Sequence, residues 1–126
     1  MAPVENFAAT PLIGRALLTT VNSSRDGSGA IETVLTAGTY GCHINRIRIK
    51  AMGSTTAGMV RLYIHDGTIY TLYDELTVTA VSANATTPSF KSEILNVNLD
   101  LPANWSLRAS SQNGENIYVI AEAGGY

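Results

Sequence analysis

The sequence predicts an all-β fold, a single-domain antiparallel β-sandwich of about eight strands with an extended N-terminal arm. Three observations favour it. Apolar and polar residues alternate with a period of two in several segments, Gly, Asn, Asp and Pro separate those segments at frequent intervals, and no segment shows convincing helical periodicity. A jelly roll is the sandwich topology that we expect, and a small barrel is the alternative.

The clearest alternation lies in residues 42–67, CHINRIRIKAMGSTTAGMVRLYIHDG. Its first half predicts a strand with Ile47, Ile49 and Ala51 buried on one face, and with Arg46, Arg48 and Lys50 solvated on the other. Its second half predicts an adjacent strand that buries Val60, Leu62 and Ile64. The opposite face of that strand, which includes Arg61 and Tyr63, is expected to be solvated, with Arg61 beside the basic row.

Turn signals delimit the other strands. Asp66-Gly67 predicts a hairpin between residues 59–66 and the long strand that follows. In that strand, 68–80, we expect Asp74 in the same row as Tyr70, Leu72 and Leu76. Asn22 to Gly29, NSSRDGSG, predicts a turn region. The remaining strands are expected at 14–21, 30–37, 90–101, 105–110 and 117–123.

Both ends of the chain carry apolar residues that lie outside the predicted strands. Residues 1–13 are expected to form an arm, because Pro3 and Pro11 interrupt regular structure, and residues 14–126 are expected to form the sandwich. Val4, Phe7, Leu12 and Ile13 are apolar enough to dock. The arm is either a disordered tail or an extension that lies on a neighbouring subunit. Tyr126 follows an apolar strand directly and is a candidate for packing against a neighbouring subunit.

Composition argues against several classes of partner. The net charge of −2 and the pI of about 5.5 predict no general attraction to nucleic acid or anionic lipid. The single cysteine, Cys42, excludes an intrachain disulfide and is expected to be a buried apolar residue. We expect no secretory signal, since the N-terminus lacks a basic region followed by an apolar run, and no segment is apolar for long enough to span a membrane.

No pattern of reactive residues predicts catalysis, a cofactor or a metal, so we expect a non-enzymatic protein. His43, His65, Asp66 and Asp74 match no established spacing of metal ligands. The row of Arg46, Arg48 and Lys50 has three interpretations: a solvated strand face, a contact with an acidic protein, or a nucleic-acid contact. The aromatic residues that could form a sugar-binding platform, although such residues more often lie in a core or subunit interface, are Tyr63, Tyr70, Tyr73 and Trp105.

The chain also resembles a family of small tailed-bacteriophage proteins, the capsid decoration or cement proteins. The resemblance covers residues 20–126 approximately and is most specific in RIRIKAMGSTTAGMVRLYIHDG. It extends to VNSSRDGSG, VTAVSANATTPSF, LPANWSLRAS and the final Gly-Gly-Tyr. The family has no enzymatic motif, and its resemblance implies a jelly roll that decorates and stabilises the capsid exterior after synthesis in the cytoplasm of the host bacterium.

The resemblance further implies a homotrimer that binds several copies of the major capsid protein, with no nucleic-acid or membrane partner. The candidate interface residues are Val4, Phe7, Leu12, Ile13, Arg46, Arg48, Lys50 and Tyr126. The alternative is a carbohydrate-binding module of a phage tail or fibre, which would use the aromatic residues.

Overall fold

A computed structural model describes residues 10–126, which form nine strands and no helix, so no helix there could cross a membrane. The predicted all-β sandwich is confirmed. The strands are β1 (Thr10–Leu18), β2 (Glu32–Thr36), β3 (Cys42–Ala51), β4 (Gly58–His65), β5 (Tyr70–Val78), β6 (Lys91–Ile94), β7 (Leu99–Leu101), β8 (Ser106–Ser111) and β9 (Ile117–Gly125).

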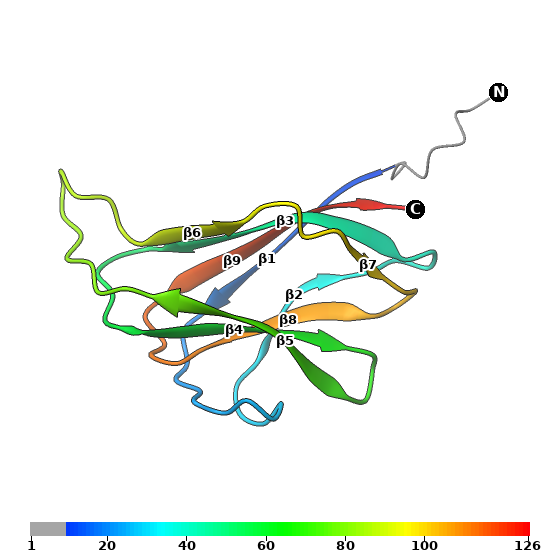
Figure 1. The fold of residues 1–126 in the computed structure, drawn as a ribbon, viewed down its shortest axis with the longest axis horizontal. Coiled ribbons are helices and arrows are strands. Elements are labelled where there is room, and N and C mark those ends of the chain that lie inside the picture. The colour runs from blue at the N-terminus through cyan, green and yellow to red at the C-terminus, as the bar shows by residue number, and fades with distance from the viewer. Residues whose placement is uncertain (1–9) are drawn as a thin grey trace.

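The strands form two antiparallel sheets stacked as two layers (Figure 1). One has the order β1-β9-β3-β6, with β7 also paired to β3, and the other has the order β2-β8-β4-β5. β6 and β7 follow one another along the same edge of β3. The single strand predicted at 90–101 is therefore wrong: Asn96 and Asn98 have φ values of 57° and 50°, which break the extended chain.

The expectation that β3 and β4 are adjacent strands is also wrong, because they belong to different sheets. Residues 52–57 carry the chain from one layer to the other. Thr55 anchors this crossing, since its amide donates to Val81 O at 2.9 Å and its hydroxyl to Thr79 O at 2.8 Å. Arg61 on β4 consequently lies in the other sheet from Arg46 and Arg48.

The core lies between the two layers and contains the faces that the alternation predicted as apolar. Ile47 and Ile49 of β3 pack in one cluster with Val60 and Leu62 of β4. Cys42 is buried beside them, as expected. The predicted hairpin of β4 and β5 is confirmed, but the predicted single row is wrong. A bulge pairs Asp74 with Leu62 and Leu72 with Tyr63, so Asp74 and Leu76 lie on the opposite side of β5 from Tyr70 and Leu72, and Asp74 is exposed.

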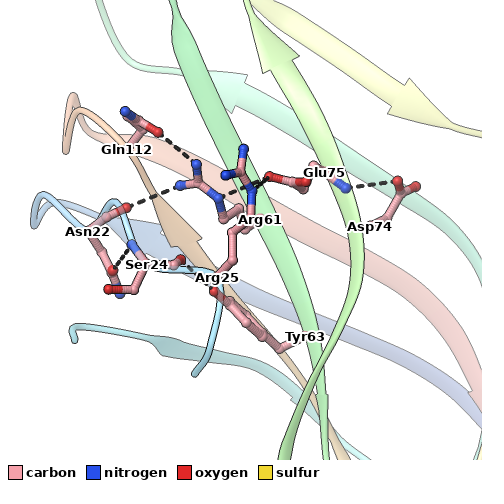
Figure 2. A network of polar contacts seen from close by, with 8 residues as sticks. All are labelled: Asn22, Ser24, Arg25, Arg61, Tyr63, Asp74, Glu75 and Gln112. Atoms are coloured by element: carbon pink, nitrogen blue, oxygen red, sulfur yellow. Dashed lines mark hydrogen bonds and ion pairs between the residues drawn. The ribbon is translucent and has the colours of Figure 1, made fainter. Parts of the chain in front are cut away.

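The loop between β1 and β2, residues 19–31, covers part of the outer side of the four-stranded sheet. The expectation that Arg61 and Tyr63 are solvated is therefore wrong, since their exposed fractions are 2% and 0%. Tyr63 Oη donates to Ser24 O at 2.9 Å, and Arg61 Nη1 donates to Asn22 O at 3.3 Å (Figure 2). Alternation reports how one strand contacts the core, but it does not report a loop that folds over the other face.

Asn22 organises this loop. Its Nδ2 donates to Ser28 O and Ala30 O, both at 2.9 Å, and its Oδ1 accepts the Ser24 amide at 2.9 Å. Replacing Asn22 with alanine should lower the free energy of unfolding by about 2 kcal/mol, because three buried or partly buried backbone groups lose their partner. Chemical denaturation measures this loss, and an unchanged midpoint with an unchanged slope would contradict it.

β1 begins at Thr10, four residues before the predicted start, so residues 10–13 belong to the sandwich and not to an arm. The antiparallel pairing of β1 with β9 runs from Thr10 opposite Gly125 to Leu18 opposite Ile117 and so includes residues 10–13. Pro11 is tolerated because β1 is an edge strand of its sheet. Val4 and Phe7 lie outside the described residues.

Candidate protein-interaction surface

The structure places the described candidate interface residues on the five-stranded sheet or, for Tyr126, directly after its strand β9. Leu12 and Ile13 lie in β1, Arg46, Arg48 and Lys50 lie in β3, and Tyr126 follows β9. Leu12 packs against the core, whereas Ile13 points outward with 71% of its surface exposed. We call the side of this sheet that faces away from the core the outer face.

The strand register sorts the outer face into four rows that run across the strands. Sequence reasoning missed Arg15 and Leu17 of β1, Asp100 of β7 and the members from β6 and β9. The rows are Leu17-Tyr118-Lys50-Lys91, Arg15-Ile120-Arg48-Glu93, Ile13-Glu122-Arg46 and Pro11-Gly124-His43-Asp100. No property of the local sequence indicates that these strands are neighbours of β3.

The outer face is positively charged in a protein whose net charge is −2. It holds five of the chain's eight Lys and Arg residues, but three of its ten Asp and Glu residues, which leaves an excess of two positive charges. Ile13, Leu17 and Ile120 interrupt these charges. A mixture of cations and exposed aliphatic side chains is suited to binding another protein surface.

The arginines of the outer face are only loosely paired. Arg48 Nε lies 3.4 Å from Glu122 Oε2 and 3.8 Å from Glu93 Oε1, and Arg46 Nη1 lies 3.8 Å from Glu122 Oε1. These side chains are 35–45% exposed, so each pair contributes less than about 1 kcal/mol. The guanidinium groups can therefore turn toward a partner at little cost in stability.

A groove of about 430 Å³ runs along one end of this face, between β1, β9 and β3. Its lining combines apolar residues with one cation and one carboxylate: Pro11, Leu12, Ile13, Asn45, Arg46, Glu122 and Ala123. The chain enters β1 at the same end of the sandwich (Figure 1). Candidate residues from β1 and β3 thus meet at one concave site.

Tyr126 is held at the same end of the sandwich. Its hydroxyl donates to Asp100 Oδ1 at 2.6 Å, and His43 Nδ1 lies 2.6 Å from the same oxygen. The Tyr126 amide donates to Gly41 O at 3.3 Å. Tyr126 is thus tied to its own chain while 43% of its surface stays exposed, which makes it an ordered contact residue.

These contacts make the stability that Asp100 contributes depend on pH. The Tyr126 hydroxyl and then His43 hold the pKa of Asp100 below its ordinary value of 3.8. A lowered pKa in the folded state stabilises the protein above pH 3.8, and this stabilisation is lost as the pH falls through the folded-state pKa. In thermal scans, the melting temperature of Asp100→Asn should be lower than that of wild type at pH 6, and this difference in melting temperature should become smaller toward pH 2. A constant difference across that range would refute the assignment.

The aromatic residues do not form one platform. Tyr63 is fully buried, and Trp105 packs against the core from the β7–β8 connection. The Tyr70 ring is engaged by His65, at 4.2 Å between centroids, and by the Arg108 guanidinium at 5.5 Å. Tyr73 is the member of this set with the largest exposed fraction. Among residues 10–126, no three His, Cys, Asp or Glu side chains gather to hold a metal.

Comparison with known proteins gives a likeness of fold. No protein-family model and no curated protein matches the chain. A chain in the acidic stable capsid structure of Helicobacter pylori bacteriophage KHP30 aligns over 93% of this chain and 88% of that chain, with a TM-score of 0.58 and 11% identity. A chain in the cyanophage Pam1 capsid asymmetric unit aligns over 100% and 92%, with a TM-score of 0.52 and 13% identity. At these identities the likeness shows a shared fold.

Proposed function

We propose that this chain is a non-enzymatic virion protein that decorates a tailed-phage capsid and binds the major capsid protein through the outer face. The observation that carries the proposal is the gathering of Ile13, Arg46, Arg48 and Lys50 on one exposed sheet face. The likeness of fold to chains from two phage capsid structures supports it. The family resemblance of residues 20–126 supports the same function.

The strand order also supports the jelly-roll assignment that this family implies. In each sheet every neighbour pair is antiparallel, and each sheet takes strands from both halves of the chain. We place the protein on the capsid exterior as a homotrimer. A protein that binds the assembled shell but not free subunits stabilises that shell by mass action, and the effect is repeated at every lattice site.

Co-sedimentation with particles that lack this protein tests the proposal. Wild-type protein should bind at saturable sites, and Ile13→Asp should weaken binding about tenfold, since a carboxylate replaces an exposed apolar anchor beside the groove. Thr71→Asp, at an exposed position in β5 of the other sheet, is the control and should bind like wild type. No binding by wild-type protein, or equal loss in both variants, would refute the proposed function of this face.

Analytical ultracentrifugation tests the oligomeric state. We expect a trimer at micromolar concentration, because the edge strand β1 and its exposed Ile13 provide surface for association between copies. A monomer at that concentration would remove the trimer from the proposal and leave capsid binding to be judged by co-sedimentation.

A further inference from the structure

Two lysines face each other across neighbouring strands on the outer face. The register pairs Lys50 of β3 directly with Lys91 of β6. Both lysines point away from the core, because the neighbouring pair in the register, Ile49 and Ser92, faces inward. Like charges directly opposite each other destabilise a sheet. These are the chain's only two lysines, and both are in this pair.

Nothing in residues 10–126 neutralises the pair. Neither lysine takes part in an ion pair there, and Lys50 Nζ donates only to the neutral Ser89 carbonyl, at 3.1 Å. Glu93, two residues from Lys91 on the same face of β6, has its carboxylate 3.8 Å from Arg48 Nε. A hollow of about 230 Å³ lies at the lysines, and its lining includes Arg48, Glu93 and Ile120. The lining of the hollow thus combines three cations and one acid with two isoleucines, Ile49 and Ile120.

We propose that Lys50 and Lys91 form a carboxylate-binding site that receives an Asp or Glu side chain of the major capsid protein. This inference rests on the proposed function and adds the chemistry of the contact. A carboxylate placed between the two ammonium groups accepts a hydrogen bond from each and removes their mutual repulsion. The uncomplexed protein therefore holds an unfavourable pair that becomes favourable on binding.

The charge pattern favours a different protein over a second copy of this chain. Most acidic side chains elsewhere on the described surface are already engaged: Asp26 with Ser28, Asp66 with Thr68 and Ile69, Glu75 with Arg25, and Glu115 with Thr56. Asp74 Oδ1 accepts the Glu75 amide at 2.8 Å, and Glu32 lies on the opposite edge strand of the four-stranded sheet. A second copy thus offers no compact group of free carboxylates.

The pattern also disfavours nucleic acid. Glu93 and Glu122 lie on the same face as the lysines and would repel a phosphate backbone that extends along it. A single carboxylate, in contrast, enters a hollow that holds three cations, Arg48, Lys50 and Lys91, and one acid, Glu93. The site is therefore suited to a discrete acidic side chain.

Lys91→Glu separates binding from folding. It places a carboxylate opposite Lys50, so the isolated variant should melt about 1–3 °C above wild type. The same substitution should weaken co-sedimentation with particles that lack this protein about 10- to 100-fold, since the partner's carboxylate now meets a carboxylate. Lys91→Gln should weaken binding less. Thr71→Glu changes the net charge as Lys91→Gln does, but on the other sheet, and should bind like wild type.

The outcomes distinguish this inference from the proposed function. If wild type binds and Lys91→Glu binds equally well, the carboxylate site is refuted while capsid decoration stands. If wild type does not bind, the proposed function fails, and the carboxylate site fails with it. If Lys91→Glu instead dissociates the homo-oligomer in ultracentrifugation, the lysines contact a second copy and the inference is overturned. A lower melting temperature of Lys91→Glu would refute the repulsive pairing on which it depends.

Discussion

Arg61→Ala should lower the free energy of unfolding by about 3 kcal/mol and release the 19–31 loop from the four-stranded sheet. Arg61 is the one basic residue among those described that is buried, and its guanidinium holds three groups from three different parts of the chain. Nε donates to Glu75 Oε2 at 3.1 Å, Nη1 to Asn22 O at 3.3 Å and Nη2 to Gln112 Oε1 at 2.8 Å (Figure 2).

The loss is large because removal of one partner leaves the others buried or partly buried without a hydrogen bond. The loss of unfolding free energy should lie at the lower end of the range measured when one partner of a buried ion pair is removed, since Glu75 is partly exposed and keeps a second cation. That cation, Arg25, lies 2.6 Å from the same Oε2 and is 56% exposed. Both arginines hold the pKa of Glu75 below its ordinary value, with Arg25 the larger influence.

Arg25→Ala is the matched control, because it removes the exposed arginine of the same carboxylate. It should lower the free energy of unfolding by less than about 1 kcal/mol. Denaturant titration gives both values, and hydrogen exchange at the Ser24 and Ser28 amides reports the release of the loop. Equal losses for the two variants would show that burial of Arg61 does not matter, and would contradict the expected order.

Gly14→Ala should lower the free energy of unfolding by about 2–3 kcal/mol by separating β1 from β2. Gly14 lies on the inner side of β1, where a methyl group would overlap the Val34 carbonyl oxygen and lie 2.7 Å from Leu35 Cβ. The overlap involves backbone, so rotation of a side chain cannot relieve it. The two sheets must move apart locally, and the contacts of the buried Leu35 loosen.

Gly53→Ala is the control for this second experiment. No atom lies within 4 Å of a methyl group added there, and Gly53 does not adopt a positive φ. This variant should be neutral or more stable by up to about 1 kcal/mol, since alanine restricts the unfolded chain. Thermal and denaturant unfolding measure both stabilities. Gly14→Ala should be less stable than wild type, and Gly53→Ala should be equal to wild type or more stable. A neutral Gly14→Ala would contradict the close approach of β1 to β2.

Much of the fold could be predicted because strands and tight turns have characteristic patterns in the local sequence. Ile47, Ile49, Val60 and Leu62 alternate with polar residues wherever one side of a strand meets the core, and Asp66-Gly67 marks its hairpin through local turn chemistry. For the same reason, only part of the candidate surface could be predicted. The cations of β3 could be assigned to a solvated face, but Lys91, Glu93 and Glu122 join them only through pairing between distant segments.

By itself, the sequence determined the fold class, most strand positions and the polarity of β3. The tertiary structure alone decided that β3 and β4 lie in different sheets, that a loop buries Arg61 and Tyr63, and that Lys50 faces Lys91. The physical reason is the range of the interactions. Alternation and turn residues act over a few neighbours, whereas strand order and the covering of a sheet face depend on contacts between residues tens of positions apart.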